Sequence, residues 1–218
     1  MKLIAHRGWS AGAGENTLAA FARAAGDDRI SGVELDVRRA AGTLVVSHDP
    51  PPDMANALTL DAALAFLAQT DLDLLVEIKE PGLVSAVIAT LVARNVAGRS
   101  VVFAFAEVAR AFPWEEVRPV RLGVIVLYPW QLDRAVAMWT PDVLMLGWDD
   151  RAWTRIAFRA WWSVFSLARL ARRHRVPVVA GIVQRAADLK WLARQGIHAA
   201  VVDFEPAAAP AGERQRSI

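Results

Sequence analysis

The stretch Val33-Glu34-Leu35-Asp36-Val37 decides how the chain is interpreted, and residues 74–79, Leu-Leu-Val-Glu-Ile-Lys, repeat its pattern. Apolar residues alternate with charged ones in both runs, with Glu34 and Asp36 in the first and Glu77 and Lys79 in the second. Side chains two positions apart on a strand lie on the same face. Glu34 and Asp36 therefore project together, and Glu77 holds a matching place in the second run. Carboxylates are costly to bury unless they are paired or bind a ligand, so the pattern predicts a functional site rather than a core.

Short runs typical of strands alternate with longer runs of helical spacing along the rest of the chain. We predict strands at Leu3–Ala5, Val33–Val37, Leu74–Ile78, Val101–Phe105, Gly123–Leu127, Val143–Leu146, Val178–Val183 and Ala199–Asp203. We predict helices at Thr17–Ala25, Leu60–Ala68, Leu83–Ala93, Glu107–Phe112, Gln131–Met138, Arg151–Arg173 and Ala186–Arg194. A further run, Leu44–Ser47, follows Ala41-Gly42-Thr43 directly after the second strand and predicts a short hairpin excursion.

This order of elements predicts an α/β protein that forms a single TIM-type (β/α)8 barrel. Strands that alternate with helices pair in parallel through right-handed crossovers, and eight such strands suffice to close the sheet. A doubly wound open sheet is the alternative, but no glycine-rich phosphate loop follows the first strand to support it. In a barrel the acids would lie inside, at the C-terminal mouth where active sites form. We assign residues 1–205 to the barrel domain and residues 206–218, which are rich in Ala, Pro and polar side chains, to a disordered tail.

The composition excludes several classes of protein. The chain has 218 residues, 55% of them apolar, and it has no cysteine, which excludes disulfides, thiolate metal sites and cysteine nucleophiles. The formal net charge is only +2, so the high pI of about 9.5 does not argue for a nucleic-acid partner. No apolar run reaches transmembrane length and no signal-peptide stretch precedes the first strand, so we expect a soluble, cytoplasmic protein.

Three carboxylates that converge on one mouth would repel each other unless a cation neutralises them. Oxygen ligands without any cysteine favour one hard divalent ion, Mg²⁺ or Ca²⁺, beside Glu34, Asp36 and Glu77. The alternative is that these acids form ion pairs with Lys79 and Arg38 at the strand ends.

Two histidines accompany the acids. His6 ends the first strand and His48 ends the hairpin excursion, so both can reach the same mouth. Each one alone is typical of a hydrogen-bonded structural histidine, but a pair beside three acids favours general acid and base roles at a phosphodiester. His174, in an arginine-rich run, and His198, at the opposite end of the last strand, are expected to be structural or solvated.

Five short segments in a fixed order carry a family resemblance. They are His6-Arg7-Gly8, Glu15-Asn16-Thr17-Leu18-Ala19-Ala20-Phe21, Val33-Glu34-Leu35-Asp36-Val37, Val46-Ser47-His48-Asp49-Pro50 and Val76-Glu77-Ile78-Lys79. Together they resemble the glycerophosphodiester phosphodiesterases, and residues 196–204 are similar to the last strand of that family. The resemblance implies a TIM barrel that cleaves glycerophosphodiesters to glycerol 3-phosphate and an alcohol with a divalent metal.

The resemblance also implies a role for each matching residue. Metal binding falls to Glu34, Asp36 and Glu77, acid–base catalysis to His6 and His48, and phosphate binding to Arg7 and Lys79, with support from Glu15 and Asn16. The charges agree with these roles. Three carboxylates, one divalent cation, two basic side chains and a singly charged diester sum to zero.

The chain departs from the family pattern in ways that bear on the substrate. After His48-Asp49 it passes through Pro50-Pro51-Pro52 almost directly into a helix, where the family carries a long insertion that shapes a cap. Residues 181–184, Gly-Ile-Val-Gln, replace the family's Trp-Thr-Val-Asn, and Ala104-Phe105 replaces its Ser-Phe. We therefore expect a reduced cap and a more open mouth, which would admit a bulkier head group or a lysolipid.

Nine tryptophans are many for this length. Trp9, Trp130 and Trp148 follow strand ends, which predicts an apolar wall for the leaving group, and we assign Trp9 and Trp148 to substrate binding. Residues 158–175, which contain Trp161-Trp162 and then several arginines, are typical of an outer barrel helix with a basic end. The alternative is a membrane-surface helix that gives weak association with lipid.

The function that the sequence favours is metal-dependent hydrolysis of a glycerophosphodiester. A phospholipase D-like or cyclising lyase reaction on lysolipids needs the same metal and histidines, so it stays an alternative. A non-catalytic phosphodiester-binding barrel is the third interpretation, although binding alone would not need an acid–base pair.

Overall fold

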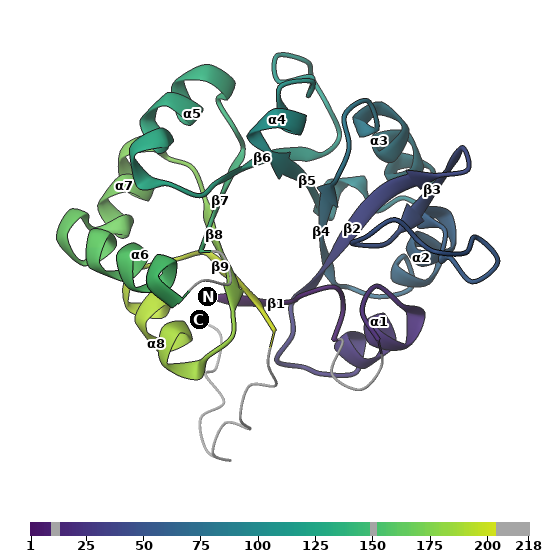
Figure 1. The fold of residues 1–218 in the computed structure, drawn as a ribbon, viewed down its shortest axis with the longest axis horizontal. Coiled ribbons are helices and arrows are strands. Elements are labelled where there is room, and N and C mark those ends of the chain that lie inside the picture. Colours follow the sequence, from purple (N-terminus) through teal and green to yellow (C-terminus); the bar gives the residue numbers. More distant parts are fainter. Residues whose placement is uncertain (10–13, 149–151, 204–218) are drawn as a thin grey trace.

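Eight parallel strands close into a barrel in the part of the chain that the structure describes, which is residues 1–9, 14–148 and 152–203. In this computed structural model the strands follow the order β1-β9-β8-β7-β6-β5-β4-β2, and β1 pairs with β2 to complete the ring (Figure 1). They are β1 (Lys2–Ala5), β2 (Gly32–Ala40), β4 (Asp73–Ile78), β5 (Ser100–Phe105), β6 (Arg121–Val126), β7 (Val143–Leu146), β8 (Val178–Val183) and β9 (Ala199–Val202). The predicted TIM-type barrel is therefore confirmed.

A hairpin extends the second strand beyond the barrel. β2 continues to Ala40 and pairs antiparallel with β3 (Thr43–Val46) through a turn at Ala41 and Gly42, both of which have positive φ. Glycine adopts that conformation without steric cost, which suits a two-residue hairpin turn. The predicted hairpin excursion is confirmed. Residues 47–59 then lead to the next helix and contain no helix or strand, in agreement with the expected reduced cap.

Helices connect successive strands around the outside of the ring (Figure 1). They are α1 (Leu18–Ala25), α2 (Leu60–Leu67), α3 (Val84–Ala93), α4 (Ala106–Ala109), α5 (Leu132–Trp139), α6 (Ala152–Phe165), α7 (Leu167–His174) and α8 (Ala186–Arg194), with 3₁₀ turns η1 (Ala97–Arg99) and η2 (Pro129–Gln131). Hydroxyl caps begin α1 and α2, because Thr17 accepts a hydrogen bond from the Ala20 amide and Thr59 accepts one from the Ala62 amide. Within the described ranges, none of the helices combines the length and the hydropathy that crossing a bilayer would take.

The single helix predicted for Arg151–Arg173 is wrong, since the chain forms α6 and α7 there and Arg151 itself lies outside the described residues. Ser166 separates them with a φ of 52°, and its hydroxyl accepts a hydrogen bond from the Arg169 amide at the start of α7. Serine competes in this way for backbone groups that would otherwise continue a helix. Because apolar residues keep their helical spacing on both sides of Ser166, the sequence pattern did not show the break between α6 and α7.

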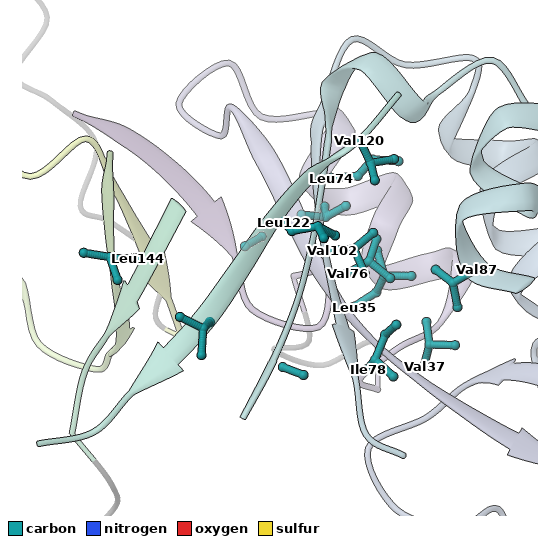
Figure 2. Packing of buried hydrophobic residues seen from close by; sticks show 14 of the residues in the cluster. Leu35, Val37, Leu74, Val76, Ile78, Val87, Val102, Val120, Leu122 and Leu144 are labelled. Atoms are coloured by element: carbon teal, nitrogen blue, oxygen red, sulfur yellow. The ribbon is translucent and has the colours of Figure 1, made fainter. Parts of the chain in front are cut away.

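The strands separate two apolar layers by simple alternation. Inside the barrel lies a small cluster: Ile4, Leu75, Val101, Phe103, Val143, Met145, Val179, Ala199 and Val201. Outside it, a larger cluster fills the space between sheet and helices, and Figure 2 shows part of this layer, including Leu35, Val76 and Val102. Glu34, Asp36 and Glu77 follow the inward-facing register, so they lie inside the barrel toward its C-terminal end.

Gly32 lies where β1, β2 and β4 meet at the other end of the barrel, paired with Ile4 and Asp73. A Cβ atom there would lie 2.5 Å from the Asp73 carbonyl oxygen and 2.8 Å from Ile4 Cδ1. We expect Gly32→Ala to lower the free energy of unfolding by about 1–3 kcal/mol, because the strands would have to separate to admit the methyl group. Urea denaturation followed by circular dichroism measures the change.

Gly98→Ala is the matched control, because a Cβ at that glycine would meet nothing within 4 Å. Equal losses of stability in the two variants would contradict the close packing of β1, β2 and β4.

Candidate active site

The C-terminal ends of the strands surround a cavity of about 330 Å³. One side of it is polar and comes from the first half of the chain: His6, Arg7, Glu34, His48 and Glu77. The other side comes from β5 to β9 and the residues that follow them, and it is mainly apolar: Phe103, Phe105, Ile125, Leu127, Met145, Leu146, Gly147, Trp148, Val179, Gly181, Ile182, Gln184 and Val201. The cavity can therefore hold a ligand with one charged end and one apolar end.

Three carboxylates meet on the polar side. Glu34 and Asp36 come from β2, and the β2–β4 register sets Asp36 opposite Glu77. One oxygen from each of the three lies within 4.8 Å of the others, while Glu34 and Asp36 are only 3% and 1% exposed. The structure thus brings together the three acids that the alternation along the strands predicted to share a face.

Burial and the neighbouring charges together shift the pKa values of the three acids in different directions. Burial, with the added repulsion of Asp36 and Glu77, raises the pKa of Glu34 well above its ordinary value. Burial also raises the pKa of Glu77, against the opposing effect of the Lys79 ammonium. For Asp36 burial would raise the pKa as well, but Lys79, Asn16 and Arg7 outweigh it and hold that pKa below its ordinary value.

The donor set fits a hard divalent cation. Glu34 Oε1 is buried and has no hydrogen-bond partner among the residues that the structure describes, whereas Oε2 of the same carboxylate accepts the Arg7 backbone amide at 2.9 Å. A buried carboxylate oxygen without a partner is costly unless a ligand takes it up. An all-oxygen group with three carboxylates is the chemistry that Mg²⁺ and Ca²⁺ prefer.

Two cations balance part of this negative charge. Lys79 Nζ lies 3.1 Å from Asp36 Oδ1 and 2.7 Å from Glu77 Oε1. Arg7 Nε lies 3.1 Å from Asp36 Oδ2, and its Nη1 donates to Glu15 at 2.6 Å. The ion pairs expected for Lys79 are therefore present.

Arg38, the other expected partner of the acids, takes no part in the cluster. It donates to the His48 carbonyl oxygen and pairs with Glu80 at 3.2 Å. The three clustered carboxylates thus outnumber the two cations that face them, Arg7 and Lys79, which leaves a net negative charge for a ligand to neutralise.

A tight turn after β1 places Arg7. Arg7 has a φ of 52° and Gly8 a φ of 72°, and the Gly8 amide donates to the Glu34 carbonyl oxygen at 3.1 Å. A Cβ on Gly8 would also lie 2.7 Å from Phe21, so only glycine fits there. Asn16 completes the arrangement from a buried position, where its amide donates to Asp36 Oδ2 at 2.9 Å. Glu15 and Asn16 thus contact Arg7 and Asp36 and do not line the cavity themselves.

Both candidate histidines line the cavity, and each has a carboxylate beside its Nδ1. His6 Nδ1 lies 3.5 Å from Asp203, and its Nε2 lies 3.9 Å from Glu34 Oε2. His48 Nδ1 lies 3.2 Å from Asp49 Oδ1. A carboxylate at Nδ1 favours the tautomer that carries the proton there, which leaves Nε2 able to accept one.

Sequence reasoning missed the carboxylate beside His6. Asp203 directly follows the last strand, and the rule that functional side chains follow the C-terminal ends of barrel strands would have identified it. The remaining histidines lie elsewhere, as predicted. His174 contacts Asp133 at 2.9 Å, and His198 is exposed just before β9.

The tryptophans divide between the core and the mouth. The assignment of Trp9 to substrate binding is not met, because its ring is only 6% exposed, packs in the outer core and lies within 6 Å of Arg23 and Arg29. The turn at Gly8 directs the chain back toward α1, since the Trp9 amide donates to the Ala20 carbonyl oxygen. Trp148 does line the cavity, and Trp130 lines a smaller aromatic pocket beside it.

Comparison with known proteins finds one matching family and a set of solved structures with the same fold. A sequence model of the glycerophosphoryl diester phosphodiesterase family matches residues 6–203. A search of curated proteins finds no match. Similar solved structures include a glycerophosphodiester phosphodiesterase from Parabacteroides distasonis, with 17% identity, a TM-score of 0.70 and coverage of 93% of this chain and 92% of that one.

A glycerophosphodiester phosphodiesterase from Agrobacterium tumefaciens has 19% identity, a TM-score of 0.67 and coverage of 93% and 96%. A phosphodiesterase from Oleispira antarctica, in complex with the product sn-glycerol-3-phosphate, has 21% identity, a TM-score of 0.67 and coverage of 93% of both chains. At these identities the structures establish a shared fold, and the family match extends over nearly the whole barrel. The chain belongs to the glycerophosphoryl diester phosphodiesterase family of enzymes.

Proposed function

We propose that this enzyme hydrolyses glycerophosphodiesters to glycerol 3-phosphate and an alcohol, with one divalent cation and two histidines. The observation that carries the proposal is the buried acidic cluster with an unpartnered Glu34 oxygen, in a cavity that His6 and His48 also line. Similarity to the Oleispira antarctica phosphodiesterase, whose structure holds sn-glycerol-3-phosphate, supports the choice of product.

Glu34, Asp36 and Glu77 would hold the cation, and Mg²⁺ or Ca²⁺ fits their oxygens. When bound, such an ion stabilises the negative charge that develops on the phosphoryl oxygens during phosphodiester cleavage. The protein's own contribution is to orient the carboxylates and to keep that of Asp36 ionised. Lys79 and Asn16 do this for Asp36 through contacts of 3.1 and 2.9 Å.

Arg7 and Lys79 would bind the phosphate. Both lie beside the acids, and Arg7 lines the cavity directly. Once a divalent cation joins the three carboxylates, the cluster with these two basic residues carries a net single positive charge. That charge matches the single negative charge of a phosphodiester.

His6 and His48 would divide the proton transfers. One histidine takes a proton from the attacking water, and the other delivers a proton to the leaving alkoxide. Asp203 and Asp49, which lie beside the two Nδ1 atoms, would keep each ring oriented with Nε2 free for this exchange.

A second candidate reaction is phospholipase D-like or cyclising cleavage of a lysolipid, in which a substrate hydroxyl attacks phosphorus. The apolar side of the cavity, with Phe105, Leu127 and Trp148, favours an apolar alcohol portion such as that of a lysolipid. Phosphorus NMR of the product separates the two reactions, since hydrolysis gives an open monoester and the lyase gives a cyclic phosphate.

Glu34→Gln tests the cation site. We expect activity to be lost and the affinity for Mg²⁺ or Ca²⁺ to fall at least about tenfold, because the variant removes an ionised ligand. In the wild type the raised pKa of Glu34 means that a proton competes with the cation. Affinity should therefore increase as pH rises through that pKa, and the variant should show a smaller increase. Isothermal titration calorimetry at several pH values measures both effects.

Glu80→Gln is the matched control, because Glu80 pairs with Arg38 outside the acidic cluster. Unchanged cation affinity in Glu34→Gln, with a correctly folded protein, would reject the assignment of this ligand.

His6→Ala and His48→Ala test the acid–base pair. Each is expected to reduce kcat by at least about 10² while cation affinity is largely retained, because each removes one proton transfer. The double variant should lose less than the product of the single losses, since the two residues act together. A nitrophenyl phosphodiester has a leaving group that needs no proton. With this substrate, only the variant that lacks the general acid should regain activity.

His174→Ala is the control, because His174 contacts Asp133 away from the cavity. If neither cavity variant slows the natural reaction even tenfold, the acid–base assignment is wrong.

Trp148→Ala tests the preference for an apolar alcohol. We expect kcat/KM for a lysophospholipid to fall about tenfold or more, because the apolar wall of the cavity is lost, with little change for glycerophosphocholine. Trp139→Ala is the control, since Trp139 stacks on Trp114 and does not line the cavity. A strong wild-type preference for glycerophosphocholine that Trp148→Ala leaves unchanged would exclude the lysolipid proposal.

A further inference from the structure

Helix α6 exposes an apolar stripe on the side that faces away from the barrel. Trp153, Ile156 and Val164 are 57%, 62% and 76% exposed, and Ala157 and Ala160 between them are exposed as well. These positions follow helical spacing over three turns, so they share one face. The opposite face of the same helix buries Phe158 and Trp162 against the core.

The charged residues of α6 lie away from this stripe. Arg155 and Arg159 both pair with the buried Asp188 of α8, at 3.2 and 2.9 Å. They therefore tie α6 to its neighbour, and among the described residues of α6 none on the outer face is charged. Such a face is unusual on a water-exposed helix and indicates a contact surface.

Aromatic residues from the connection between β6 and α5 extend the stripe. Tyr128 and Trp130 are 40% and 65% exposed and stack on each other with ring centroids 4.8 Å apart. Trp130 contacts Trp161 of α6 edge-on at 6.3 Å, and Trp161 contacts the exposed Phe165 at 4.6 Å. We call these residues and the stripe together the aromatic face: Tyr128, Trp130, Trp153, Ile156, Ala157, Ala160, Trp161, Val164 and Phe165.

Basic residues border the aromatic face on the α7 side. Arg169 and Arg173 line a hollow of about 250 Å³ together with the aromatic residues Trp130, Trp161, Trp162 and Phe165 and one acid, Asp133. Arg172 is exposed on the same helix. Figure 1 shows α6 and α7 next to each other on the outside of the ring. Aromatic rings beside guanidinium groups are the combination that settles at the boundary between anionic lipid head groups and acyl chains.

The aromatic face also adjoins the active-site cavity. A pocket of about 130 Å³ lies between Trp130, Trp153 and Trp161 on one side and Leu127 and Trp148 on the other. Leu127 and Trp148 line the active-site cavity too. A surface bound to this face would therefore lie next to the mouth, where a substrate could enter from it.

We propose that the aromatic face docks on the surface of an anionic lipid membrane. The exposed tryptophans and tyrosine enter the head-group region, and the α7 arginines attract the anionic head groups. Docking concerns binding alone, so it holds or fails independently of the proposed hydrolysis. A second copy of the chain could cover the same face in a symmetric dimer. This is less favourable, because the α7 arginines of the two copies would approach one another and repel.

Vesicle co-sedimentation tests the docking. Wild-type protein should bind vesicles of phosphatidylcholine mixed with phosphatidylglycerol, and bind pure phosphatidylcholine vesicles at least about tenfold more weakly. Ile156→Glu and Val164→Glu should each weaken binding to the mixed vesicles at least about tenfold, because a carboxylate would be carried into the head-group region. Val92→Glu, on the exposed side of α3, is the matched control and should bind as the wild type does.

Further variants and readouts separate the proposal from its competitors. Arg169→Gln combined with Arg173→Gln should lower both the binding to mixed vesicles and its sensitivity to salt. Hydrolysis of a water-soluble diester should be the same in all these variants. Absence of vesicle binding, equal binding to neutral vesicles, or a wild-type dimer in sedimentation velocity that Ile156→Glu dissociates would each overturn the proposal.

Discussion

The repulsion among three buried carboxylates is the constraint on which the rest of the site depends. Glu34, Asp36 and Glu77 have oxygens within 4.8 Å of one another, in an interior where charge is poorly screened. The fold responds by placing Lys79 two residues after Glu77 on the same face and by returning Arg7 from the end of β1. The unusual backbone at Arg7 is explained by the same need, because its own amide must reach Glu34 while its guanidinium reaches Asp36. Strained backbone of this kind is maintained where the surrounding contacts determine it. Here Arg7 has two contacts with β2, to Glu34 and Asp36, and two with the residues before α1, Glu15 and Asn16.

Most of the barrel could be predicted from the sequence because alternation and helical spacing are local properties. The bounds of β7 and β8 agree with the prediction, since both strands are continuous apolar runs that end at polar or glycine residues. Ser166 was missed because it breaks a helix through its own conformation, while the residues on either side keep the helical pattern. β2 was predicted three residues too short at its C-terminal end, because its last residues belong to the hairpin and not to the barrel.

The acidic cluster could be predicted from the sequence better than the groups around it. Alternation fixes the face of a side chain, so Glu34 and Asp36 were expected together from spacing alone. The direction of Trp9 depends on the turn at Gly8 and on the contact with Ala20, which are set by tertiary packing. Asp203 reaches His6 only because barrel closure sets β9 beside β1, a pairing that joins the two ends of the chain. The place of Asp203 after the last strand marks it as a residue of the mouth, but its pairing with His6 follows only from the closed barrel.

The cavity has a charged side and an apolar side, and this division sets the direction in which a substrate would lie. Charged groups come from β1 to β4, whereas β5 to β9 contribute mainly apolar side chains, so polarity changes across the mouth. A phosphodiester bound at the acids and their cations would direct one substituent toward Phe105, Leu127 and Trp148, because the opposite side is filled by polar groups. The connection from β3 to α2, residues 47–59, contains no helix or strand. Trp148 lines the apolar side of the cavity, and it also lines the pocket that Trp130, Trp153 and Trp161 form beside α6. The apolar side of the cavity and the aromatic face thus adjoin, because the two pockets share Leu127 and Trp148, and a substrate with an apolar substituent at that side would lie next to an exposed apolar surface.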